Sequence, residues 1–277
     1  MSFSAAPPEW SAMDEPYELA PAIIEDFQAH GHTVVRGLAS PSEVALHAPA
    51  IVAFEPELAR RIGPLEERGT YGKAFLQGHN LWTRDESIKR FVFSARFARV
   101  AAQLLGVDGV RLYHDQSLTK EPGGGLTPWH QDQTYWPLDT DKTITMWMPL
   151  VDVPAEVGSM TFVDGSFAHG NLGPWIIGDE SEAAFSELIA RMGFSTRTHG
   201  ALQAGDATFH RGWTLHSAPP NPTDLVRSVM TVIWYAEGTR VSDDLTGVRQ
   251  FDHKLWLNGI PPGELADGPI NPVLWPR

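Results

Sequence analysis

Cysteine is absent from this chain of 277 residues. Its absence excludes disulfides, thiolate zinc sites, iron–sulfur clusters and a cysteine nucleophile. Any bound metal must therefore be held by histidine, carboxylate or other oxygen and nitrogen ligands.

Long hydrophobic runs are also lacking. The longest strongly apolar run, from Ile144 to Val151, is far shorter than the ~20 residues that a membrane span requires. The first ten residues, MSFSAAPPEW, have neither the basic region nor the apolar core of a secretory signal. We expect a cytoplasmic protein without a membrane partner.

Positive charge is scarce, because 21 Lys and Arg face 34 Asp and Glu and give a formal net charge of −13. Such a surface repels nucleic acid and anionic lipid, so a small molecule is the expected partner. A basic stretch from Arg84 to Arg111 partly offsets the negative charge, and we interpret it as a solvated helix face. The sequence does not indicate the oligomeric state.

The first third of the chain has apolar residues at helical spacing. A helix is predicted over residues 18–30, ending at Gly31 as its C-cap. The segment Ser40-Pro41-Ser42-Glu43 is a capping box with proline at the first helical position, which predicts a helix to about residue 54. Another helix is predicted from a cap at Ser87 to Leu105.

From residue 110 the pattern changes to strands rich in β-branched and aromatic residues. They cover residues 110–120, 127–133, 142–153, 158–166, 205–218 and 227–238, with one helix at about 182–192. Helices followed by strands predict an α+β, mainly β fold: a β-sandwich or jelly-roll barrel backed by N-terminal helices. We expect one domain over 1–277, with a helical part at about 17–106, a core at about 107–240 and a C-terminal wrap at 241–277.

The segment His130-Gln131-Asp132 is the first candidate for a metal site. Residues two apart on a strand point to the same face, so His130 and Asp132 could bind one ion. Such pairs also arise by chance, and the ordinary alternative is a surface histidine beside a turn aspartate.

His216 and Arg227 form the second candidate. His216 ends the predicted strand at 205–218, and Arg227 opens a strand of apolar residues, where an arginine is costly to bury without an anionic partner. An edge-strand arginine facing water is the ordinary alternative. Two histidines and one carboxylate on one face of an octahedral ion leave three open positions, as in Fe(II) oxygenases. A 2-oxo acid could occupy two of these and O₂ the third, with Arg227 pairing with the far carboxylate of 2-oxoglutarate.

The segments TPWHQDQTYWP, GSMTFVDGS and LHSAPPN, followed by Arg227, resemble the phytanoyl-CoA dioxygenase family of 2-oxoglutarate oxygenases. The resemblance runs from about Tyr113 to Tyr235. It implies a double-stranded β-helix fold of the jelly-roll or cupin-like kind. It also implies that His130, Asp132 and His216 bind iron and that Arg227 binds the 2-oxoglutarate tail. One departure is Asp164-Gly165-Ser166-Phe167, where the family often has Pro-Gly-Ser-His.

Further site residues are expected around this set. Trp147 stands where family members often place a tryptophan beside 2-oxoglutarate, and Gln116 and Lys120 have the strand parity to reach it. Trp129 and Tyr135, beside His130, are candidate substrate contacts, although core packing accounts for most aromatic residues here. His210 shares the predicted strand and parity of His216, and we interpret it as a hydrogen-bonded core histidine rather than a pocket residue.

The sequence therefore predicts an enzyme: an Fe(II)- and 2-oxoglutarate-dependent dioxygenase that uses O₂ to hydroxylate, or otherwise oxidise, an unactivated C–H bond of a small molecule. Succinate and CO₂ would be the other products. The alternatives are a cupin-like metal enzyme that does not use 2-oxoglutarate, and a non-catalytic β-sandwich that binds 2-oxoglutarate or sugar. The primary substrate cannot be read from the sequence, because one such scaffold accommodates many chemistries.

Overall fold

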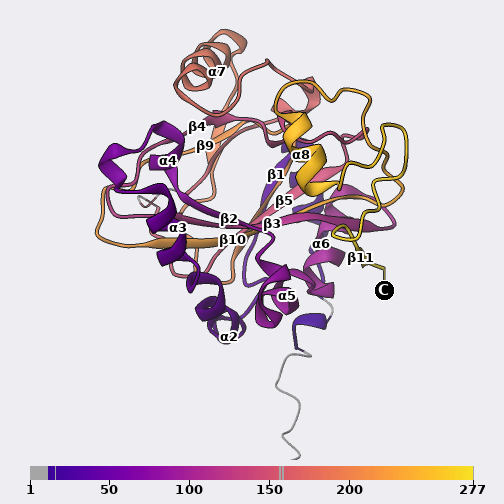
Figure 1. The fold of residues 1–277 in the computed structure, drawn as a ribbon, viewed down its shortest axis with the longest axis horizontal. Helices are drawn as coiled ribbons and strands as arrows, with labels where there is room; N and C mark the ends of the chain where they lie inside the picture. The colour runs from indigo at the N-terminus through magenta and orange to yellow at the C-terminus, as the bar shows by residue number, and fades with distance from the viewer. Residues whose placement is uncertain (1–11, 16, 156, 158, 277) are drawn as a thin grey trace, which may run out of the picture.

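Two antiparallel sheets form the centre of the protein (Figure 1) in the computed structural model, which describes residues 12–15, 17–155, 157 and 159–276. The larger sheet has the order β1 (His32–Val35), β8 (Ala207–Arg211), β5 (Thr143–Pro149), β10 (Arg227–Ala236), β3 (Val110–Lys120) and β11 (Val273–Trp275), with β2 (Leu76–His79) also pairing with β3. The smaller sheet has the order β4 (Thr127–His130), β9 (His216–Ala218), β6 (Thr161–Val163) and β7 (Thr196–Thr198).

Alternation along the strands gives the larger sheet two different faces. In β5, Ile144, Met146 and Met148 belong to the main hydrophobic core, whereas Thr145 and Trp147 line a cavity. This is the period of two that a strand imposes on its side chains. The sheet therefore has one face for packing against helices and one for building a site.

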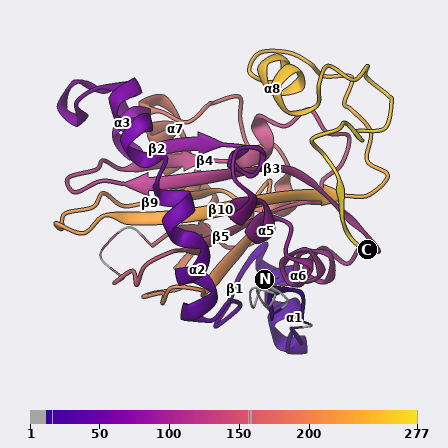
Figure 2. The same cartoon turned by 60° about the horizontal axis from the view of Figure 1, so that its bottom comes forward.

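Four helices cover the core face of the larger sheet, on the side away from α8 (Figure 2): α1 (Pro21–His30), α2 (Pro41–Val52), α5 (Glu86–Val92) and α6 (Ala95–Leu105). The other two N-terminal helices are α3 (Glu55–Ile62) and α4 (Thr70–Ala74). Short 3₁₀ turns are η1 (Ala12–Asp14), η2 (Leu65–Glu67), η3 (Leu81–Thr83), η4 (Asp132–Thr134) and η5 (Ser166–His169). The later helices are α7 (Asp179–Met192), which contacts β4, and α8 (Arg249–Trp256).

Several sequence predictions are confirmed at the level of single residues. The α1 helix ends at Gly31, whose φ of 82° is the left-handed conformation of a glycine C-cap. At α2, the Glu43 amide donates to the Ser40 hydroxyl at 3.2 Å and the Ser40 amide donates to the Glu43 carboxylate at 2.7 Å. The capping box therefore has both of its hydrogen bonds.

The single helix predicted from Ser87 to Leu105 is wrong, because it is two helices. Asp85, not Ser87, caps α5 by accepting from the amides of Ser87 and Ile88. Ser94 then caps α6 by accepting from the Phe97 amide. A serine that can satisfy the free amides of a helix start favours a break at that point over continued helix.

The strand predicted over 205–218 is also wrong, because it is two strands in different sheets. A turn separates β8 from β9, with the Thr214 amide donating to the Arg211 carbonyl at 2.9 Å. Gly212 belongs to this turn, and a Cβ there would lie 2.3 Å from the Thr143 hydroxyl. His210 and His216 therefore face each other from opposite sheets instead of sharing one strand. The predicted strand at 127–133 likewise ends at His130, and Asp132 begins η4.

The C-terminal segment contains more regular structure than the predicted wrap at 241–277. It contains α8, and β11 pairs with the start of β3 through Val273↔Arg111 and Trp275↔Val110. Within the described residues, no helix has the length and apolar character needed to cross a membrane.

Candidate metal centre and active-site cavity

Two histidines and one aspartate meet where β4 and β9 pair. His130 and His216 are direct cross-strand partners, and Asp132 follows on η4. One ligand atom from each of the three residues lies within 4.8 Å of the others. Oδ1 of Asp132 is 3.6 Å from the Nε2 of His130 and 3.7 Å from that of His216.

Hydrogen bonds to the backbone orient both rings. Nδ1 of His130 lies 2.8 Å from the Pro128 carbonyl, and Nδ1 of His216 lies 2.9 Å from the Thr214 carbonyl. A carbonyl only accepts, so each Nδ1 carries the proton and each Nε2 presents a lone pair. The two lone pairs belong to atoms that face the Asp132 carboxylate.

The second oxygen of Asp132 is held by residues of the larger sheet. Oδ2 accepts hydrogen bonds from the Thr145 hydroxyl and the His210 Nε2, both at 3.0 Å. These bonds leave Oδ1 turned toward the two histidines. The hydrogen-bonded histidine expected at position 210 is therefore present, and it also lines the cavity.

The protonation states suit metal binding. Burial lowers the pKa of His130 and of His216, so both rings are neutral at neutral pH. Burial alone would raise the pKa of the Asp132 carboxyl, but the hydrogen bond that it accepts from His210 holds it below its usual value. Neutral imidazoles and an ionised carboxylate are the forms in which these groups bind metals.

The donor set fits Fe(II). Two imidazole nitrogens and one carboxylate oxygen converge from one side, and hydrogen bonds to backbone, threonine and histidine fix their directions. Such outer hydrogen bonds accompany metal ligands in general. The facial arrangement is the one used by non-haem iron oxygenases.

A cavity of about 470 Å³ opens onto this set. Its volume lies in the range of small-molecule sites. Strands of both sheets, α4 and α8 contribute its walls, which are largely aromatic and apolar. The aromatic lining residues are Tyr71, Phe75, Tyr135, Trp136, Trp147, Phe251 and Trp256.

One end of the cavity is electropositive. Arg227 is 2% exposed, and its guanidinium lies 5.2 Å from the centre of the Trp147 ring. Lys120 is its cross-strand partner, and burial together with Arg227 lowers the pKa of Lys120 to about 7. The Lys120 ammonium donates to the Thr127 hydroxyl and the Pro219 carbonyl, and it does not line the cavity.

The other predicted site residues are placed differently. Gln116 and Trp147 line the cavity, as does Tyr135, whose hydroxyl accepts from the Ile177 amide at 2.8 Å. Trp129 is not among the lining residues and packs beside the core under α7. The sequence therefore placed Trp129 and Lys120 closer to the cavity than the structure does.

Sequence reasoning missed a second group of lining residues, which comes from β2, β3, α4 and α8: Tyr71, His79, His114, Asp252 and Trp256. The histidines had no partner at ligand spacing, and α8 was hidden in the predicted wrap. The sequence does contain a signal for a helix here. Phe251 and Leu255 are four residues apart, as are Asp252 and Trp256, and residues four apart share a helix face.

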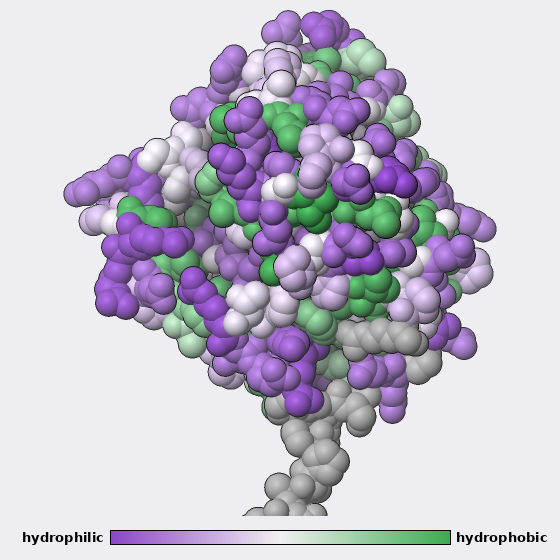
Figure 3. All heavy atoms as spheres, turned by 45° about the vertical axis from the view of Figure 1, so that its right-hand side comes forward, coloured by the Kyte–Doolittle hydropathy of each residue, from purple (hydrophilic) through white to green (hydrophobic). Residues whose placement is uncertain are grey.

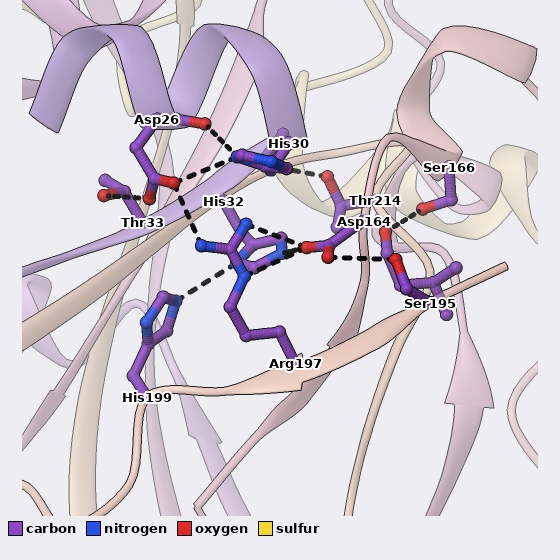
Figure 4. A network of polar contacts seen from close by, with 12 residues as sticks. Asp26, His30, His32, Thr33, Asp164, Ser166, Ser195, Arg197, His199 and Thr214 are labelled. Atoms are coloured by element: carbon purple, nitrogen blue, oxygen red, sulfur yellow. Dashed lines mark hydrogen bonds and ion pairs between the residues drawn. The ribbon is translucent and has the colours of Figure 1, made fainter. Parts of the chain in front are cut away.

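A polar network braces the smaller sheet from behind (Figure 4). Its centre is His32, which lies 3.1 Å from His199 and 2.9 Å from the Asp164 carboxylate, while Arg197 joins Asp164 to Asp26. The His32 ring stacks on Phe162, with centroids 4.6 Å apart, and Phe162 contacts His216. The Asp164 that departs from the family pattern therefore joins β1 and β7 behind the metal ligands.

Together, the two facing sheets and the histidine–aspartate set define the class of jelly-roll proteins with a site for non-haem iron. The phytanoyl-CoA dioxygenase (PhyH) family model matches residues 27–229, so the chain belongs to this family.

Similar proteins agree with this assignment. A probable alpha-ketoglutarate-dependent hypophosphite dioxygenase of Stutzerimonas stutzeri is 25% identical over 158 residues, which are 53% of this chain and 52% of the relative. The chain thus matches about half the length of that relative.

Among solved structures, the alpha-ketoglutarate-dependent carbocyclase SnoK from nogalamycin biosynthesis has a TM-score of 0.74 at 24% identity, covering 94% of this chain and 99% of its own. The epimerase SnoN, in complex with Fe³⁺, alpha ketoglutarate and nogalamycin RO, has a TM-score of 0.69 at 26% identity, covering 91% and 97%. SnoK supports the jelly-roll fold, and SnoN also shows the cofactor and co-substrate of a similar protein.

Proposed function

We propose that this protein is an Fe(II)- and 2-oxoglutarate-dependent dioxygenase that hydroxylates, or otherwise oxidises, an unactivated C–H bond of a small molecule. One observation carries the proposal: a single cavity contains the His130, Asp132 and His216 donor set and the electropositive end at Arg227. A metal enzyme that does not use 2-oxoglutarate would not need a buried arginine there to bind the far carboxylate of that molecule.

His130, Asp132 and His216 would hold the iron. Iron, when bound, would supply the redox chemistry by which O₂ converts 2-oxoglutarate to succinate and CO₂ and oxidises the substrate C–H bond. The Nδ1 hydrogen bonds would keep both imidazoles in the binding tautomer, and His210 and Thr145 would keep Asp132 aimed at the same point.

Arg227 would bind the distal carboxylate of 2-oxoglutarate through its two-pronged guanidinium. The Trp147 ring lies 5.2 Å from the guanidinium, and Lys120 on the next strand adds positive potential in its protonated form. Gln116 lines the cavity from β3, between Lys120 and His114 along that strand, and would contact the co-substrate. The aromatic walls, Tyr135 among them, would exclude water from the reacting groups. The placement of Trp129 gives a direct substrate contact no support.

The substrate would be a small or medium free molecule rather than a coenzyme A ester, despite the family's name. A polyphosphate handle needs cations, and Arg227 is the only arginine or lysine among the described lining residues. None of the basic residues between Arg84 and Arg111 lines the cavity. The chain would act as one cytoplasmic oxygenase domain over 1–277 without nucleic acid or membrane partners, in keeping with its net charge of −13.

The test is succinate formation from 2-oxoglutarate in the presence of Fe(II) and O₂, with Asp132→Ala as control. Even without the native substrate, slow uncoupled turnover and a visible band of the anaerobic Fe(II)–2-oxoglutarate complex are expected from the wild type and not from the variant. Binding of 2-oxoglutarate without succinate formation would favour a non-catalytic protein. Turnover of a substrate with Fe(II) alone would favour a cupin-like enzyme.

A further inference from the structure

We propose that the α8 end of the cavity binds a basic amine carried on an apolar, ring-containing substrate, with the Asp252 carboxylate as its counter-ion. We call Asp252, Trp256, His79 and His114 the amine subsite. The inference deepens the proposed function and rests on it, because the same cavity would bring the substrate to the metal.

The amine subsite lies far from the electropositive end. His114 of β3 pairs with Ile233 of β10, whereas Arg227 begins β10 six residues earlier. At the rise of a strand, six residues correspond to roughly 20 Å. A ligand of the subsite therefore does not compete with a 2-oxoglutarate bound at Arg227. The metal donor set is level with the subsite along the sheet, because Thr145, which donates to Asp132, also pairs with Ile233.

Charge singles out Asp252. Asp132 and Asp252 are the only carboxylates among the described residues that line the cavity. Asp132 belongs to the metal donor set. Asp252 is therefore the lining carboxylate to which the proposed iron chemistry gives no role. An anionic group brought to this end would be repelled, and a cation would be attracted.

Asp252 is fixed in place by neutral donors. It is 8% exposed, and its Oδ2 accepts from the Tyr113 hydroxyl at 3.0 Å. Burial raises the pKa of its carboxyl to about 7, and hydrogen bonds from Tyr113 and Trp256 offset only part of that effect. An ammonium group beside this carboxyl would favour its ionised form and would gain a partner that is already oriented.

The neighbouring rings present π faces and lone pairs rather than charge. Trp256 stacks on His79 with ring centroids 5.2 Å apart and an interplanar angle of 23°, and its ring lies 5.2 Å from that of His114. Burial lowers the pKa of His79 to about 4 and that of His114 well below its usual value, so both are neutral. His114 is 2% exposed, and its Nδ1 meets no hydrogen-bond partner among the described residues. Aromatic faces beside a carboxylate suit a cation.

Hydrophobic side chains surround this end of the cavity at the surface. Phe251 and Leu255 of α8 line the cavity while remaining 65% and 41% exposed. Ile176, next in the chain to the lining residue Ile177, is 51% exposed. Figure 3 shows hydrophobic residues gathered across the middle of this side of the molecule. Apolar and aromatic side chains around one carboxylate indicate a ring-containing substrate that carries a single amine.

The experiment measures binding to the Fe(II)- and 2-oxoglutarate-loaded enzyme by calorimetry without O₂ at pH 7.5. The probes are matched sets with the same ring: tryptamine, tryptophol and indole-3-acetate, and 2-phenylethylamine, 2-phenylethanol and phenylacetate. Each set is titrated into the wild type, Asp252→Asn and Asp243→Asn. Asp243 is exposed and does not line the cavity, so its variant makes the same change of charge outside the subsite.

In the wild type and in Asp243→Asn, we expect each amine to bind at least tenfold more tightly than its alcohol, and the acids to bind most weakly. Asp252→Asn should weaken amine binding at least tenfold and change alcohol binding less than twofold. A panel in which no amine exceeds its alcohol partner, or a preference that survives in Asp252→Asn, overturns the proposal. The wild-type comparison decides the question even if the variant does not fold. Failure of the oxygenase function is seen separately, as a missing visible band.

Discussion

Replacing Arg227 with methionine should remove most of the affinity for 2-oxoglutarate while leaving the iron site intact. The guanidinium is 2% exposed, and its ring partner Trp147 stays in place in the variant. Removing one member of a buried, hydrogen-bonded charge pair costs about 2–5 kcal/mol. Lys120, the cross-strand neighbour, remains as a second cation and offsets part of the loss, so we expect about 2–4 kcal/mol. That corresponds to a Kd for 2-oxoglutarate about 30- to 700-fold higher.

The assay is an anaerobic titration of the Fe(II)-loaded protein with 2-oxoglutarate, followed by the visible band. Arg84→Met, which changes a half-exposed arginine outside the cavity, is the matched control and should bind normally. Iron affinity, measured separately, should change little, because the hydrogen bonds that orient His130, Asp132 and His216 are all retained in the variant. A variant that loads iron normally and keeps the wild-type Kd for 2-oxoglutarate would refute the assignment of Arg227.

Three further outcomes are expected. His210→Phe should weaken Fe(II) binding about 10- to 100-fold, because Asp132 loses an orienting hydrogen bond; equal iron affinity would contradict this role. Asp252 has its folded-state pKa raised to about 7, so the folded protein holds a proton between about pH 4 and 7 that the unfolded chain has lost. Wild type should therefore lose stability relative to Asp252→Asn as pH rises through this window, by at most about 4 kcal/mol in denaturant titrations, and a difference that does not change with pH would argue against it. Ser40→Ala should cost about 1 kcal/mol of unfolding free energy through loss of the α2 cap, whereas Ser42→Ala should cost less.

Local chemistry made part of the fold predictable. The Ser40 capping box, the Gly31 cap and the β3 strand at residues 110–120 each depend on a few adjacent residues, and the structure contains all three. The breaks at Ser94 and Gly212 were missed because uninterrupted periodicity hides a competing cap or a tight turn. In both places a single small residue allows a break in the backbone while the apolar pattern continues through it.

Only those residues of the candidate site that lie in recognisable sequence motifs were predictable. His130, Asp132, His216 and Arg227 have recognisable contexts, and the structure brings all four to one cavity. Tertiary packing decides the rest. Lys120 has the strand parity to reach the cavity, yet its ammonium donates to oxygens of neighbouring loops instead. His210 was expected on the strand of His216, although the two belong to different sheets.

The α8 helix lies at residues 249–256, beyond the residues 27–229 that match the family model. The segment that shapes the outer end of the cavity is thus separate, along the chain, from the strands that carry the metal donors and the Arg227 end. Substitutions in α8 can alter which molecules fit without disturbing the pairing of β4 with β9. For an engineer, a library confined to the cavity-lining positions of α8 would sample new substrates on the same oxidising scaffold. Arg249 of the same helix would have to be kept, because it donates to the carbonyls of Gln133 and Thr134 beside Asp132.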